Sequence, residues 1–191
     1  MARLRWIEDS EADEATARSF DEVRKRRSRV PPVMRTMSLR PDVMVQVARL
    51  ADTLHFSDGF LDRRTKEKIA TYVSALNSCG YCATSHRVFL ETAGEQQGSA
   101  RAIETGNLDS AAVDDRERKL LELVGVQTTS PSDITDEQIE ELRSLGWSDE
   151  ELVEALLDGA LFNFFNRMVE SFGLKSSDFV PMANGAPAQD T

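Results

Sequence analysis

The chain of 191 residues lacks several features that would place it in a specialised class of protein. No stretch approaches the ~20 consecutive apolar residues of a transmembrane helix. The N-terminal stretch turns acidic soon after Trp6, where a secretory signal would need an apolar core. With 40% apolar residues, the composition is that of an ordinary globular protein. We therefore expect a soluble, cytoplasmic protein with one main domain over residues 38–181, a charged extension over 1–37 and a disordered tail over 182–191.

Basic residues are too few to balance the acidic ones, with 23 Lys and Arg against 33 Asp and Glu and a net charge of −10. An acidic surface repels phosphate backbones and anionic lipids, so neither a nucleic acid nor a membrane is an expected partner. One basic run covers residues 24–29. We interpret it as a solvated helix face that pairs with the acidic residues before it, rather than as a patch for an anionic partner.

The chain has only two cysteines, Cys79 and Cys82. A secreted disulfide scaffold would use more cysteines at wider spacing. A lone C-x-x-C in a cytosolic chain is typical of a redox pair or of a metal site. Two other interpretations remain open: a zinc site completed by His86, His55 or a carboxylate, and a pair of small core residues. A thioredoxin-like fold would require a strand before the motif, and none is indicated.

Helical periodicity is what the sequence does contain, and no alternating strand pattern is present. The expected fold class is all-α, with seven or eight helices. Thr135 with Gln138 and Ser148 with Glu151 form capping boxes that open two of them. The apolar side of the first helix is expected to consist of Val43, Val47, Leu50, Ala51 and Leu54. The predicted helices cover residues 41–54, 62–76, 79–93, 96–104, 114–127, 135–145 and 148–172.

The helix predicted over residues 148–172 is apolar on nearly every side, which is typical of a central helix or of a subunit interface. Asn163 and Asn166 are the polar exceptions. Their amides are expected to form hydrogen bonds across a core or an interface; the alternative is that they line a ligand site.

Cys79, Cys82 and His86 lie on one face of the helix predicted over residues 79–93. The helix N-terminus is expected to lower the pKa of the thiols. A lower pKa also weakens the nucleophile, so a group that moves protons is needed as well, and His86 is the natural candidate. Glu67 on the preceding helix lies among arginines and lysines and, taken alone, is interpreted as a surface residue.

Glu67, Cys79, Cys82 and His86 together form the pattern E-x11-C-x-x-C-x3-H. The pattern resembles the signature of the AhpD-like alkylhydroperoxidases of the carboxymuconolactone decarboxylase superfamily. The sequence over residues 61–90, together with that over residues 149–174, resembles the peroxidase-related branch of that family. The resemblance covers residues 38–174, although Tyr81 stands where the best-characterised members have histidine.

The resemblance implies an AhpD-like helical bundle with the C-x-x-C at a helix N-terminus. It implies that Cys82 attacks a peroxide, that Cys79 then forms a disulfide with it, and that Glu67 and His86 relay protons. Hydrogen peroxide or an organic hydroperoxide is the implied substrate, and a lipoyl or thioredoxin-like dithiol is the implied electron donor. No cofactor or metal is implied, and the protein is expected to be a homo-oligomer: a dimer, trimer or hexamer.

Two other functions remain open at this point. The protein could be a thiol–disulfide oxidoreductase that passes electrons to a protein partner, or a non-catalytic redox sensor. Both would keep the Cys79–Cys82 pair. The oxidoreductase would react with peroxide no faster than an ordinary thiol does, and the sensor would be oxidised without turnover under any dithiol.

Overall fold

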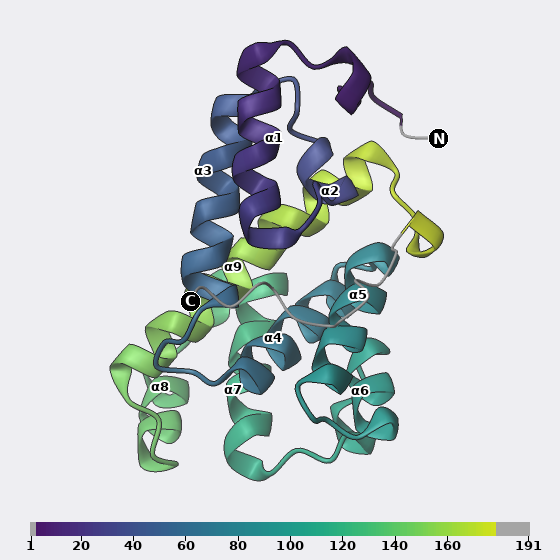
Figure 1. Ribbon diagram of the computed structural model, residues 1–191. Coiled ribbons are helices and arrows are strands. Elements are labelled where there is room, and N and C mark those ends of the chain that lie inside the picture. Colours follow the sequence, from purple (N-terminus) through teal and green to yellow (C-terminus); the bar gives the residue numbers. More distant parts are fainter. Residues whose placement is uncertain (1–2, 179–191) are drawn as a thin grey trace.

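The computed structural model describes residues 3–178, and the predicted tail over 182–191 lies outside this range. Within it the chain forms nine α-helices and no strand, which confirms the all-α prediction (Figure 1). Among the described residues, no helix is long and apolar enough to span a bilayer. The helices are α1 (Glu14–Arg27), α2 (Pro32–Arg35), α3 (Pro41–Ala51), α4 (Arg63–Leu76), α5 (Gly80–Thr92), α6 (Gln97–Glu104), α7 (Asp115–Thr129), α8 (Asp136–Ser144) and α9 (Asp149–Phe172).

All seven predicted helices are present as α3 to α9. Both capping boxes form, at Thr135 for α8 and at Ser148 for α9. The predicted count of seven or eight falls short of the nine described helices, because no helix was expected at the proline pair where the single-turn α2 begins. Helix α1 is so rich in charge that its short apolar side, which includes Phe20 and Val23, gives little periodic signal.

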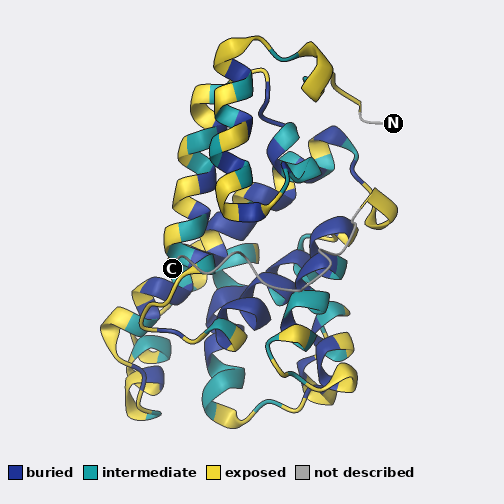
Figure 2. Ribbon diagram, viewed as in Figure 1, coloured by how far each residue is buried: buried dark blue, intermediate teal, exposed yellow. Residues whose placement is uncertain are grey.

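Helix α4 lies at the centre of the molecule, packed against α5, α7 and α9 (Figures 1 and 2). Its residues Ile69, Ala70 and Val73 are completely buried. The neighbouring run Lys66-Glu67-Lys68 is also buried, with at most 1% of each residue exposed. Glu67 is therefore an interior carboxylate, and the interpretation of it as a surface residue was wrong.

Helix α9 is buried along one side, which includes Phe162 and Phe165. Its other side exposes three large apolar residues, Val153, Leu157 and Phe164. The sequence predicted that α9 would be either the central helix or part of a subunit interface. In this chain the central helix is α4. The other predicted place, a subunit interface, stays a prediction.

Helix α3 is paired with α1 (Figure 1). Its buried face consists of Met44, Ala48 and Ala51, whereas Val43 and Leu50 are exposed. The expected apolar side is confirmed for Ala51, and Val47 and Leu54 pack against the core, but the expectation was wrong for Val43 and Leu50. Helix α1 packs on α3 and covers the face that carries Met44 and Ala48. Phe20 of α1 joins the same core as Met44 of α3.

Candidate functional site

The connection between α4 and α5 positions the cysteine pair. Ser78 adopts a left-handed conformation with φ of 56°. Cys79 follows as the N-cap residue of α5, and its amide donates to the carbonyl of Ser74 at 2.9 Å. Cys82 lies in the first turn of α5, so the C-x-x-C stands at a helix N-terminus as predicted.

The two thiols are buried to different degrees. Cys79 is completely buried, whereas 4% of Cys82 is exposed. Both are free thiols packed near Val169 and Phe172 of α9. Cys82 lines a cavity of about 90 Å³ and Cys79 does not. A small molecule that enters this cavity therefore meets Cys82 first.

Amide side chains connect α4 to α9 beside the thiols. Asn77 Nδ2 donates to Asn163 Oδ1 and to Asn166 Oδ1, both at 2.9 Å. Asn166 Nδ2 in turn donates to Ser74 Oγ at 3.0 Å. The predicted hydrogen bonds across the core are confirmed. Asn166 also lies near the Cys82 thiol and lowers its pKa, an influence that the sequence did not predict.

The pKa of the Cys82 thiol is raised well above its usual value. Burial is the largest cause, and the adjacent Cys79 thiol adds to it, whereas Asn166 acts in the opposite direction. The expectation that the helix N-terminus lowers the pKa was wrong for Cys82, because desolvation outweighs the helix dipole. The thiol therefore needs a base before it can act as a nucleophile.

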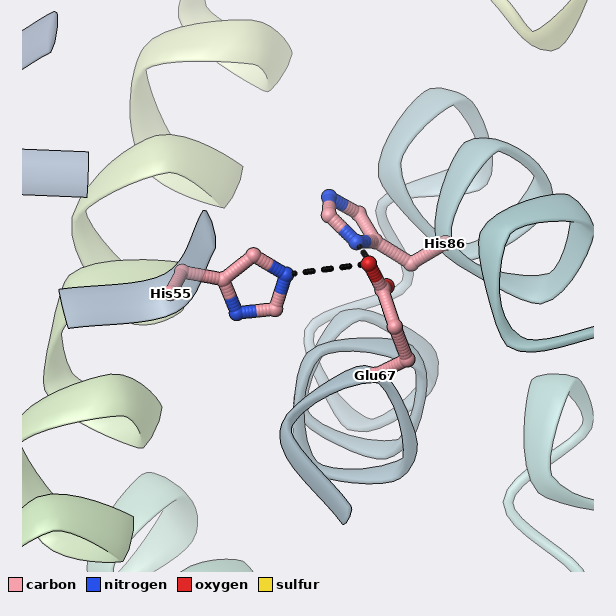
Figure 3. A group of neighbouring side chains, drawn as sticks. All are labelled: His55, Glu67 and His86. Carbon is pink, nitrogen blue, oxygen red and sulfur yellow. Dashed lines mark hydrogen bonds and ion pairs between the residues drawn. The ribbon is translucent and has the colours of Figure 1, made fainter. Parts of the chain in front are cut away.

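The base predicted for this role, His86, lines the same cavity as Cys82. Its Nδ1 lies 2.6 Å from Glu67 Oε2 (Figure 3). Arg63 Nε donates to the other carboxylate oxygen of Glu67 at 2.9 Å. The structure thus brings His86 and Glu67 together, and it places Cys82 and His86 on one cavity with Cys79 outside it.

A second histidine completes this group. Helix α3 continues into a single π-helical turn, η2 (Asp52–Phe56), which carries the fully buried His55. His55 Nε2 lies 3.2 Å from Glu67 Oε1 and its Nδ1 lies 3.0 Å from Asp158 Oδ1 (Figure 3). The sequence suggested His55 only as a zinc ligand and missed Asp158. One signal was available, because Asp158 is a carboxylate within the apolar pattern of α9.

The protonation of the group follows from its contacts. Burial alone would raise the pKa of Glu67, but the charges of His86 and His55 and their hydrogen bonds hold it well below its usual value. Burial would lower the pKa of His55, but the Asp158 and Glu67 carboxylates raise it overall. The pKa of His86 is lowered, mainly by burial, despite the Glu67 charge. His86 is then neutral with its proton on Nδ1 toward Glu67, which leaves Nε2 as a proton acceptor.

His55, Glu67 and His86 place three potential metal ligands within 4.8 Å of one another. However, Glu67 already accepts hydrogen bonds from Arg63, whose guanidinium would repel a divalent cation at the same oxygen. The negative charges of the Asp158 and Glu67 carboxylates are balanced by the positive charges of Arg63 and a protonated His55. This group contains neither cysteine, so it does not match the zinc site on Cys79 and Cys82 considered above. The donor set fits protons better than a metal ion.

The cavity beside Cys82 has mainly apolar walls. Four phenylalanine side chains, including Phe56 and Phe162, surround it. Tyr81 also lines it and is 5% exposed, as expected for a wall residue. Burial raises the pKa of its hydroxyl, so Tyr81 is a neutral phenol. Such a cavity favours small molecules with an apolar body.

The all-helical fold and the C-x-x-C at the start of α5 can be compared with known proteins. Residues 41–106 match the carboxymuconolactone decarboxylase family. The chain is similar to a peroxidase-related protein with an AhpD core from Ralstonia eutropha JMP134, with 25% identity over 91% of each chain and a TM-score of 0.81. The chain therefore has an AhpD-like fold, and its similarity to the carboxymuconolactone decarboxylase family covers residues 41–106.

Two further structures share the fold. A peroxidase-related protein from Silicibacter sp. TM1040 is 22% identical over 85% of this chain and 86% of its own, with a TM-score of 0.76. The debrominase Bmp8 is 20% identical over 87% of this chain and 88% of its own, with a TM-score of 0.70. No curated protein has a significant sequence match to the chain.

Proposed function

We propose that the protein is a thiol peroxidase that works through a Cys79–Cys82 dithiol–disulfide cycle. One observation carries the proposal: Cys82 and His86 border one cavity, while Cys79 lies buried beside Cys82 outside it. This arrangement supports different roles for the two sulfurs: Cys82 reacts with the substrate, and Cys79 then forms the disulfide with it. The peroxidase-related name of the Ralstonia structure supports the same chemistry.

In the first step, His86 Nε2 accepts the proton of the Cys82 thiol, and the thiolate attacks the terminal oxygen of the hydroperoxide. The S–O bond forms as the O–O bond breaks, and the leaving alkoxide takes the proton from His86 as an alcohol. Cys82 is left as a sulfenic acid. The Cys79 thiol then attacks the Cys82 sulfur, which forms the disulfide and releases water. An external dithiol returns two electrons and two protons.

Glu67 acts on this step through His86. Its carboxylate accepts the Nδ1 proton and so keeps Nε2 as the base, which is the role that a carboxylate plays behind many catalytic histidines. The pair His55 and Asp158 holds Glu67 from the other side. We therefore assign His55 and Asp158 as positioning residues of the proton relay.

Stopped-flow oxidation of the reduced protein by hydrogen peroxide and by cumene hydroperoxide tests the proposal. Loss of both thiols much faster than for free cysteine is expected. Cys79→Ser should still react and accumulate a sulfenic acid that a dimedone probe traps, whereas Cys82→Ser should be inert. Oxidation of the wild type at the rate of a free thiol would overturn the peroxidase and favour the oxidoreductase or the sensor.

A second candidate function is reductive removal of halogen from a small aromatic ring. The aromatic walls of the cavity beside Cys82 favour it, and Bmp8 has been crystallised as a cysteine-to-alanine variant with 2,3,4-tribromopyrrole. In such a reaction the dithiol supplies two electrons, the C–Br bond is replaced by C–H, and bromide leaves as the disulfide forms. Bromide released from tribromopyrrole by the wild type in the presence of dithiothreitol, but not by Cys82→Ser, would support this function. Bromide release by the wild type no higher than in the protein-free control would exclude it.

A further inference from the structure

The cavity beside Cys82 differs in charge from the rest of the protein. The chain carries a net charge of −10. Nevertheless, the described residues that line the cavity include no carboxylate, and their charged side chains are Arg27 and Arg29. These arginines belong to the basic run that was interpreted as a solvated helix face. That interpretation was wrong for Arg27, which is only 8% exposed. Arg27 is the last residue of α1 and lines the cavity.

Arg27 has unused hydrogen-bonding capacity. Its Nη2 donates to Asp52 Oδ1, and its Cζ lies 4.3 Å from the centre of the Phe56 ring. Its Nε is buried and has no hydrogen-bond partner. A buried donor without an acceptor is unfavourable, and guanidinium groups prefer carboxylate acceptors. Arg27 itself lines the cavity, so an oxyanion bound there would lie beside this guanidinium.

We infer that the cavity selects substrates with a carboxylate attached to an apolar body; this rests on the proposed peroxidase function and specifies its substrate class. Arg27 contacts the carboxylate, the phenylalanine walls hold the apolar body and Cys82 faces the reacting group. One molecule can contact both ends because Arg27 and Cys82 line the same cavity. Half-buried residues such as Val33 and Phe89 also line the cavity, so its wall reaches toward solvent.

A matched pair of hydroperoxides tests the inference. Cumene hydroperoxide and 4-(2-hydroperoxypropan-2-yl)benzoic acid differ only in the carboxylate. The wild type should oxidise with the acid on the order of tenfold faster than with the neutral compound, the gain of one charge-assisted hydrogen bond. In Arg27→Gln this ratio should fall to about one, and Arg27→Lys should restore part of it. Because the ratio is taken within each variant, a general loss of activity does not affect it.

Arg26→Gln is the matched control. Arg26 precedes Arg27 on α1 and lies 3.6 Å from Asp52, but its side chain is 45% exposed and does not line the cavity. The ratio should be unchanged in this variant. Equal rates for the two hydroperoxides in the wild type would overturn the inference while leaving the peroxidase intact, and so would a ratio that survives in Arg27→Gln.

A binding measurement separates the inference from the peroxidase reaction itself. The product alcohol 4-(2-hydroxypropan-2-yl)benzoic acid should bind the reduced protein on the order of tenfold more tightly than 2-phenylpropan-2-ol in calorimetry. Arg27→Gln should abolish the difference. If peroxide failed to oxidise Cys82 but this difference in affinity remained, the proposed peroxidase function would be refuted and the proposed carboxylate site would be supported. Equal affinities of the two alcohols would overturn the carboxylate site.

Discussion

Glu67 is the residue on which the candidate site depends, because its two carboxylate oxygens meet donors from three directions. His55, His86 and Arg63 all contact it. With no exposed surface, Glu67 has little access to water and its charge is balanced only by these neighbours. Its carboxylate favours the His86 tautomer with the proton on Nδ1, which leaves Nε2 free for the proposed role as the base for Cys82.

His86→Ala should change the pH dependence of thiol oxidation. In the wild type the pKa of His86 is lowered, so the base is already neutral and the rate should be nearly constant between pH 7 and pH 8.5. Without His86 the reaction depends on thiolate formed by hydroxide, so the rate should drop ~10²–10⁴-fold at pH 7 and then rise about tenfold per pH unit. Stopped-flow oxidation by cumene hydroperoxide measures both. Arg87→Ala is the control, because Arg87 is the next residue of α5 and pairs with Glu91. An oxidation rate that did not change with pH in His86→Ala would refute the role of His86 as the base.

Asp158→Asn should destabilise the protein in a pH-dependent manner. Asp158 raises the pKa of His55 above its usual 6.5, so the stabilisation is fully present below pH 6.5 and declines as the pH rises through the higher folded value. The loss of unfolding free energy in the variant should therefore be larger at pH 6 than at pH 9, as measured by urea denaturation. Asp109→Asn, at a side chain that is 99% exposed, should show a small and constant difference. A loss in Asp158→Asn that grew with pH would contradict the assignment.

At the scale of elements, three successive charged residues connect α4 to its neighbours. Lys66 Nζ lies 2.6 Å from Glu154 of α9, and Lys68 Nζ lies 2.7 Å from Glu117 of α7. Glu67 faces η2 and α5 between them. Because consecutive residues on a helix point about 100° apart, one run of charge can contact three sides of the bundle.

Helices α7 and α9 pack closely at Gly159. A Cβ at this position would lie 2.7 Å from both Val124 Cγ1 and Gln127 Oε1. Gly159→Ala should therefore force the helices apart and cost ~1–3 kcal/mol of unfolding free energy in urea denaturation. Gly98→Ala is the matched control, since a Cβ there meets nothing within 4 Å and the change should be neutral or stabilising. Equal effects at both glycines would mean that this contact is looser than described.

The sequence predicts those parts of the site that follow from local helical geometry. Cys79, Cys82 and His86 share one helix face through their spacing alone, and the resemblance to a known family added Glu67. His55 and Asp158 are 103 residues apart and meet only after α3 and α9 have packed. Hydrophobic periodicity places such residues on elements but does not show which buried charges will face one another.

Burial limits what the sequence shows about Arg27 and Cys82 as well. A basic run is exposed in most proteins, and a thiol at a helix N-terminus usually has a lowered pKa. In this fold α1 buries Arg27 against the cavity, and desolvation reverses the shift expected at Cys82. Both outcomes depend on tertiary packing, which a single sequence does not contain.

At the scale of the whole molecule, the exposed apolar side of α9 defines where a second copy is expected. Val153 and Leu157 are 56% and 53% exposed, and they border a shallow hollow together with Phe60. Leu157→Glu should lower the mass of the predicted homo-oligomer in light scattering, because a charge would replace an apolar contact. Lys119→Glu on α7, a polar position, should leave the mass unchanged. A wild-type protein that is monomeric at high concentration would refute the predicted oligomer.

The depth of Cys79 has a practical consequence for chemical labelling. A small alkylating agent can reach Cys82 through the cavity, but a bulky maleimide cannot reach a sulfur with no exposed surface unless the α5–α9 contact opens. A native protein with both thiols reduced will therefore give a thiol count well below two with large reagents. The rate at which the second label appears then reports how often this part of the fold opens, so labelling of Cys79 measures local unfolding.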